Sequence, residues 1–126
     1  MDGEIKLVDS ELKVMDVLWK EGEAPARYVA NVMTEKYGWN VNTTYTLLKR
    51  CIYKGAVERT EPNFICKAIL PREKVQHQEV DALLQRLFDG SADKLFSALL
   101  SGKRLTTSQI QNLRELVEQY EDEGDA

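Results

Sequence analysis

Residues 39–57 have the sequence WNVNTTYTLLKRCIYKGAV, and the pattern within this stretch decides the expected fold. An α-helix turns by about 100° per residue, so side chains three and four positions apart share a face. Asn40 and Asn42 offer capping side chains and Gly55 ends the pattern, which predicts a helix over residues 43–54. One face of this helix is expected to lie on a core and carries Thr44, Leu47, Leu48, Cys51 and Ile52.

The opposite face of the predicted helix is polar and has no carboxylate. It combines two threonines, a tyrosine and three cations: Thr43, Thr46, Lys49, Arg50, Tyr53 and Lys54. Threonine and arginine can hydrogen-bond base edges, and lysine and tyrosine can contact phosphate oxygens, so this face suits the major groove of DNA. Asn42 before this face and Arg59 beyond the helix complete the expected DNA contacts. A basic helix face can also be merely solvated, and the order of elements around it decides between the two interpretations.

Two amphipathic helices are expected before this stretch. Residues 8–11 offer caps for the first, and apolar residues recur at helical spacing until Gly22. Pro25 is suited to the first position of the second helix, which ends at Gly38.

After the third helix the pattern becomes typical of strands. Residues 56–60 and 64–69 are predicted to form a hairpin around a short turn, where Asn63 can adopt a left-handed conformation. Three helices followed by a hairpin give the element order of a winged helix-turn-helix. We therefore expect a mainly α chain with this DNA-binding domain at residues 1–70.

The net charge of −4 conceals an uneven distribution. Residues 1–70 hold ten Lys or Arg and ten Asp or Glu, whereas residues 71–126 hold seven and eleven. Within residues 43–59 there are four cations and only Glu58 as a carboxylate. A local basic patch of this kind binds phosphate whatever the total charge is.

Residues 71–126 are predicted to form a helical dimerisation region. One helix follows Pro71, a second follows the cap Ser91, and a third begins with a capping box at residues 106–109. The apolar side chains exceed what these short helices can bury on themselves, so a homodimer is expected. The expected dimer contacts are Leu83, Leu87, Phe96, Leu99, Leu113, Leu116 and Val117.

Several functional classes are not expected from this sequence. No apolar run approaches the roughly 20 residues that span a bilayer, and residues 1–8 lack the features of a signal peptide, which predicts a cytoplasmic protein without membrane insertion. Cys51 and Cys66 have no nearby partner and His77 is the only histidine, so neither a metal site, a cofactor nor a catalytic triad is expected. Glu11 and the other helical carboxylates lie on polar faces, which does not suggest an enzyme.

Three segments carry a family resemblance. Residues 39–57 resemble the recognition segment of the penicillinase repressor family, the BlaI/MecI/CopY group, and residues 11–19 and 113–117 resemble its first and last helices. The resemblance implies a dimeric repressor with a winged-helix head and a palindromic operator. It also implies that three residues occupy DNA-contacting positions: Thr43, Thr46 and Arg50.

The resemblance also bears on how such a repressor is released. Antibiotic-responsive members are cut within the fifth helix, which implies a proteolytic switch at Ala98 and Leu99 and a membrane-bound regulatory protease as partner. The same residues are equally explained as dimer core, which their helical spacing favours. Copper-responsive members carry Cys-x-Cys motifs near the C-terminus, whereas residues 120–126 are YEDEGDA, so metal sensing of that kind is not expected.

Two hypotheses of function follow. The first is a sequence-specific repressor that an inducing signal releases from its operator. The alternative is a winged-helix interaction module whose basic face binds an acidic protein partner. Threonines beside cations favour the first hypothesis, because a protein interface usually presents an aromatic or aliphatic anchor at its centre.

Overall fold

The computed structural model describes residues 4–124, and the chain divides into two compact units, Met1–His77 and Gln78–Ala126. The N-terminal three residues and the final two residues of the acidic C-terminal end lie outside the described residues. No helix within residues 4–124 is long and apolar enough to cross a membrane.

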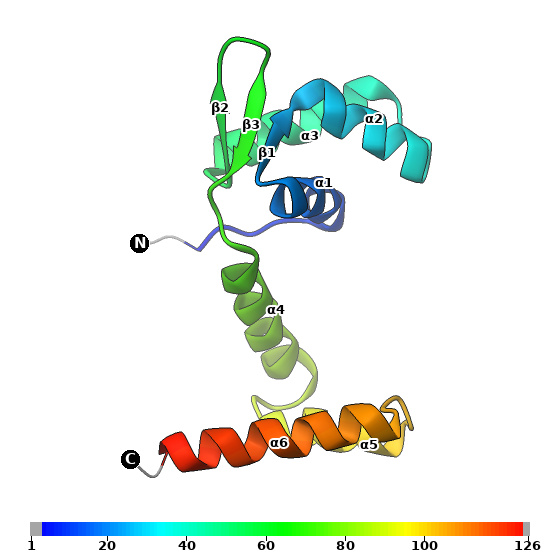
Figure 1. The fold of residues 1–126 in the computed structure, drawn as a ribbon, viewed down its shortest axis with the longest axis vertical. Coiled ribbons are helices and arrows are strands. Elements are labelled where there is room, and N and C mark those ends of the chain that lie inside the picture. Colours follow the sequence, from blue (N-terminus) through cyan, green and yellow to red (C-terminus); the bar gives the residue numbers. More distant parts are fainter. Residues whose placement is uncertain (1–3, 125–126) are drawn as a thin grey trace. The chain divides into compact units, whose positions relative to one another are not determined.

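The first unit combines three helices with a small antiparallel sheet (Figure 1). The helices are α1 (Asp9–Glu21), α2 (Ala26–Tyr37) and α3 (Val41–Lys54), and the strands are β1 (Glu23–Pro25), β2 (Val57–Thr60) and β3 (Ile65–Ala68). β3 lies between the other two strands, and its pairing with β2 forms a hairpin. We call this hairpin, residues 57–68, the wing. The expected mainly α winged-helix fold is confirmed.

The strand β1 was not expected from the sequence, and the placement of Pro25 at the first position of α2 was wrong. Pro25 has an extended backbone, with φ −62° and ψ 145°, and precedes the first helical residue, Ala26. It closes a three-residue strand in which buried Ala24 lies opposite Cys66 of β3. Three residues are too few to show an alternating pattern in the sequence.

The stretch of residues 39–57 forms a helix that begins two residues earlier than its pattern indicates. Asn40 is the N-cap, because its side-chain oxygen accepts a hydrogen bond of 2.8 Å from the backbone N–H of Asn42. Gly55 ends α3 in the left-handed conformation, with φ 88°, which glycine adopts without steric cost. The N–H of Gly55 donates to the carbonyl oxygen of Ile52 at 3.0 Å and the N–H of Ala56 donates to that of Cys51 at 2.9 Å, so two carbonyl groups of the last turn have partners.

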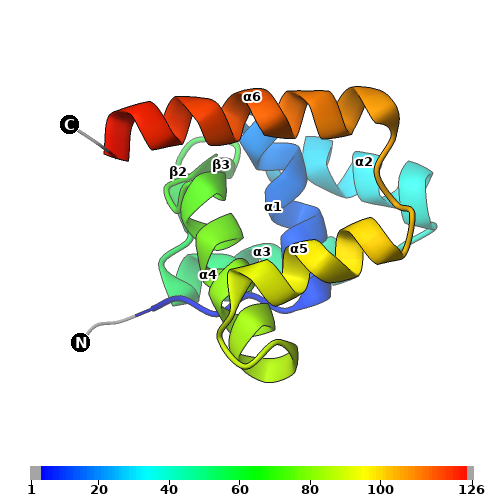
Figure 2. The ribbon, with the colours of Figure 1, turned by 90° about the horizontal axis from the view of Figure 1, so that it is seen from below.

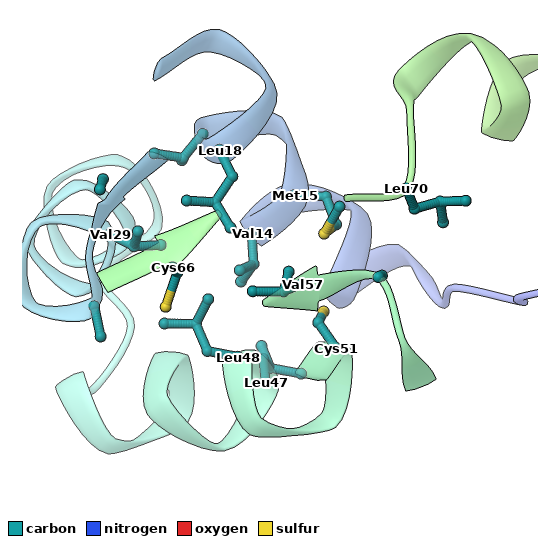
Figure 3. Packing of buried hydrophobic residues seen from close by; sticks show 14 of the residues in the cluster. Val14, Met15, Leu18, Val29, Leu47, Leu48, Cys51, Val57, Cys66 and Leu70 are labelled. Atoms are coloured by element: carbon teal, nitrogen blue, oxygen red, sulfur yellow. The ribbon is translucent and has the colours of Figure 1, made fainter. Parts of the chain in front are cut away.

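The core of the first unit is built from all three helices and the sheet (Figure 3). The inner face of α3 lies where its periodicity predicted it, and its buried residues are Thr44, Leu47, Leu48 and Cys51. They meet side chains of the other elements: Val14, Met15 and Leu18 of α1, Val29 of α2, Val57 of β2 and Cys66 of β3. This packing fixes which face of α3 points outward.

Both cysteines belong to this core. Their sulfur atoms lie among the apolar side chains in Figure 3, and both residues are fully buried. Burial raises the pKa of Cys51 to about 12 and that of Cys66 to about 11. Both are therefore neutral thiols near pH 7 and act as small apolar side chains.

The start of α4 (Arg72–Leu87) belongs to the first unit. Val75 is buried there, and the Arg72 guanidinium lies 2.9 Å from the Asp16 carboxylate of α1. The indole N–H of Trp19 donates a hydrogen bond of 2.8 Å to the carbonyl oxygen of Leu70. These contacts hold the chain against α1 as it leaves the sheet.

The second unit contains the rest of α4, α5 (Ala92–Ser101) and α6 (Thr107–Gly124). The predicted capping box of α6 is confirmed, because the side chains of Thr106 and Gln109 bond each other's backbone N–H at 3.0 and 2.9 Å. Among its described residues no side chain is fully buried. α5 and α6 are joined by a short loop and run in opposite directions (Figure 2). They border an open groove of about 660 Å³, whose apolar lining on the two helices is Phe96, Leu100, Ile110, Leu113 and Val117.

Candidate nucleic-acid interface

The outward face of α3 forms one continuous polar strip. Its exposed residues are Asn42, Thr43, Thr46, Lys49, Arg50 and Tyr53. Two adjoining shallow hollows share Thr46 and Arg50, which shows that these side chains lie next to one another. Tyr53 is 92% exposed although it is aromatic, so its ring has no packing role in the described chain.

Two cations of this strip are available to a ligand. Lys49 and Arg50 are exposed, and neither has an ion-pair partner among residues 4–124. Arg50 lies beside Thr46, so a guanidinium fork and a hydroxyl group face the same space. This combination can bond the hydrogen-bonding groups that bases present in the major groove.

Lys54 belongs to the same helix but is engaged within the protein. Its ammonium lies 2.7 Å from the Glu11 carboxylate of α1 and 2.9 Å from the carbonyl oxygen of Lys6. Glu11 is only 1% exposed and also accepts the N–H of Val8 at 2.9 Å. The sequence placed Glu11 on a polar helix face, whereas the structure shows it buried beside α3. Contact of Lys54 with DNA stays a prediction.

We expect Lys54→Met to destabilise the first unit. The substitution leaves the buried Glu11 carboxylate without its cation, and breaking a buried ion pair costs about 3–5 kcal/mol. Because the Lys54 side chain is 32% exposed, we expect a smaller loss of about 2 kcal/mol in the free energy of unfolding. Urea unfolding measures this loss, with Lys49→Met as the matched control on the exposed face. Equal urea midpoints for the two variants would show that the pair contributes nothing.

Arg59 lies on β2, in the wing rather than on α3. Its guanidinium carbon is 3.5 Å from the centre of the Phe64 ring, and its Nε donates to the Glu61 carboxylate. The Phe64 ring packs against Tyr45 of α3, with 5.8 Å between ring centres. The wing is thus joined to α3 through two aromatic rings, a connection that the sequence did not reveal.

The residues expected at a dimer contact lie on the helices of the second unit with much of their surface open. Leu83, Leu99 and Leu113 are half-buried, whereas Leu87 is 65% exposed. Phe96, Leu116 and Val117 are also exposed and line a second apolar hollow with Leu113 and Tyr120. Ala98 and Leu99 are half-buried within α5.

No group of three His, Cys, Asp or Glu that could hold a metal ion occurs within residues 4–124. The polar strip of α3 brings exposed cations and hydroxyl groups together on one helix face. The first unit has three helices and a wing, and its third helix presents a basic face. These features define the class of winged-helix DNA-binding domains.

Comparison with known proteins identifies the family within this class. The family model described as penicillinase repressor matches residues 7–119, so the chain belongs to this family of DNA-binding transcriptional repressors. The resemblance predicted from the sequence is confirmed.

Individual relatives are distant but cover most of the chain. The penicillinase repressor of Bacillus licheniformis is 23% identical over 117 residues, which are 91% of each protein. A protein of Latilactobacillus sakei, described as an uncharacterized 16.5 kDa protein in the ptsI 3′ region, is 24% identical over 114 residues, 89% of this chain and 78% of that one. The solved DNA-binding domain of the repressor BlaI superposes with a TM-score of 0.53 at 26% identity, covering 59% of this chain and 93% of that domain.

Proposed function

We propose that this chain represses transcription in the cytoplasm by binding a palindromic operator as a homodimer, with α3 of each protomer in the major groove of one half-site. The observation that carries the proposal is the exposed strip of α3, where Thr46 and Arg50 lie together and no carboxylate interrupts the cations. The proposed base contacts are Thr43, Thr46 and Arg50, and Asn42, Lys49 and Tyr53 are proposed to contact the backbone.

The open apolar surface of the second unit supports the homodimer. Its two hollows are lined by leucines, Phe96 and Val117. In a monomer water would fill these hollows. Covering such a surface is favourable by about 25 cal/mol for each Å² of apolar area removed from water. A second copy of the same helices offers a complementary apolar face, as the commonest symmetric dimers do.

The location of α5 supports a release step by proteolysis. Ala98 and Leu99 follow Phe96 in this helix, and Phe96 lines both apolar hollows. A cut at Ala98–Leu99 would remove α6 from the proposed dimer contact without changing any residue of α3. We propose that a membrane-bound regulatory protease makes this cut when the inducing signal arrives.

A titration with two duplexes tests the proposed function. The full chain is first used to select bound fragments from the source genome, and the selected duplex is then compared with a random duplex of equal length. We expect the selected duplex to bind at least about 10³-fold more tightly, as specific DNA-binding proteins do. The affinity for both duplexes should fall steeply between 50 and 200 mM salt, because counterions are released from each contacted phosphate. A failure to select any sequence, or DNA binding that does not weaken as the salt concentration rises, would contradict the proposed function.

A further inference from the structure

The wing contains a carboxylate, Glu61, that forms an ion pair with a cation of the same hairpin, Arg59. Glu61 follows β2 directly, and its Oε2 accepts the Nε–H of Arg59 while its Oε1 accepts the backbone N–H of Phe64 at 3.3 Å. One carboxylate thus bonds a guanidinium and a backbone amide at the same time. The hydrogen bond from Arg59 lowers the pKa of the Glu61 carboxyl, so this group is ionised near pH 7.

A guanidinium together with a backbone N–H is a donor set that proteins use to bind phosphate oxygens. Arg59 is also held in place, because its guanidinium stacks on the Phe64 ring and this ring packs on Tyr45 of α3. The donors therefore have a defined position relative to the recognition helix. Glu61 supplies the two acceptor oxygens that a DNA phosphate would otherwise supply.

The charge of the wing agrees with this arrangement. Residues 57–68 contain Arg59 and Lys67 as cations and Glu58 and Glu61 as anions, so the hairpin as a whole is neutral. A phosphate that approaches Arg59 meets a guanidinium that is already paired and a carboxylate of its own sign. The wing has the donors for a backbone contact but not the net charge that attracts DNA.

We propose that Arg59 and the Phe64 N–H form a phosphate site that Glu61 fills in the DNA-free protein, so that Glu61 limits the contribution of the wing to DNA binding. The proposal rests on the proposed function, since the phosphate belongs to bound DNA. Both charged side chains are well exposed, at 40% and 59%, so without the Glu61 carboxylate the Arg59 guanidinium is open to another anion.

The test is Glu61→Gln in the full chain, with binding to a random-sequence duplex measured by fluorescence anisotropy at several salt concentrations. We expect the affinity at low salt to rise about 3- to 10-fold, because Arg59 is released to one backbone phosphate. The slope of log K against log salt should steepen by about 1 for each wing that contacts the DNA.

Two controls separate this site from a general effect of charge. Glu58→Gln removes the same charge from the same hairpin, and we expect it to change the affinity and the slope less than Glu61→Gln does. The double variant Arg59→Gln/Glu61→Gln should lose the gain, whereas Arg59→Gln alone should change the affinity less than about twofold because its cation is already paired.

The results of these titrations also separate a failure of the wing site from a failure of the proposed function. If the unaltered chain binds no DNA in a salt-dependent way, the proposed function fails. If the unaltered chain binds DNA and Glu61→Gln leaves the slope unchanged, or if the gain persists without Arg59, the wing site alone is overturned. All of these positions are exposed, and thermal unfolding of each variant verifies that the fold is retained.

Discussion

Arg50→Ala is expected to weaken binding to the selected operator by about 1–3 kcal/mol, or roughly 5- to 150-fold, the range for the loss of a good base contact. The side chain is exposed on α3 beside Thr46 and has no ion-pair partner among residues 4–124, so its guanidinium is available to a base. Random DNA offers no fixed base at that position. The affinity of Arg50→Ala for random DNA should therefore fall only by the contribution of one lost charge.

The measurement is a pair of titrations, operator and random duplex, at one salt concentration. Lys49→Ala is the matched control, because it removes one exposed cation one position away on the same helix and is proposed to contact the backbone. It should weaken both duplexes by similar factors. If Arg50→Ala also lowers both affinities by the same factor, Arg50 binds the backbone and contacts no base.

The two faces of α3 could be predicted from the sequence because they follow from helical geometry alone. Apolar residues at helical spacing have to be removed from water, and Leu47, Leu48 and Cys51 are indeed buried. The opposite face then points outward by necessity. The order of the three helices and the hairpin predicted the fold for the same reason. In each of these segments the spacing of apolar residues, or the change in that spacing, indicates a helix or a strand.

Contacts between distant positions could not be predicted in this way. Glu11 and Lys54 are 43 residues apart, and each looks like a solvated surface residue when its own helix is considered alone. Only the packing of α1 on α3 brings them together. The link from Arg59 through Phe64 to Tyr45 has the same origin, because it depends on how the wing folds back toward α3.

The end of the DNA-binding domain is a third such feature. The change of pattern at Pro71 suggested a domain of residues 1–70, whereas the compact unit in the structure extends to His77. The first turn of α4 contributes buried Val75 and the ion pair of Arg72 with Asp16. A fragment of the domain should therefore include this turn, and a fragment that ends at residue 70 should be less stable.

A fragment of residues 1–77 is expected to fold as a monomer and to bind the full operator about 10²- to 10⁴-fold more weakly than the intact chain. In a dimer, the binding of one head holds the second head near its half-site, so the second contact forms at a high effective concentration. The fragment retains every proposed DNA contact of α3 but has lost this linkage. Its affinity for a single half-site should equal that of one head of the intact protein.

Sedimentation and operator titration of both proteins, at one salt concentration, test this expectation. Val117→Asp in the intact chain is the matched variant, because it places a charge in the apolar hollows of α5 and α6 and keeps all helices in the chain. Burying an unpaired carboxylate at a protein contact is costly, so this variant should sediment as a monomer and bind the operator like the fragment. An intact chain that is already monomeric, or a fragment with undiminished operator affinity, would remove dimerisation from the mechanism.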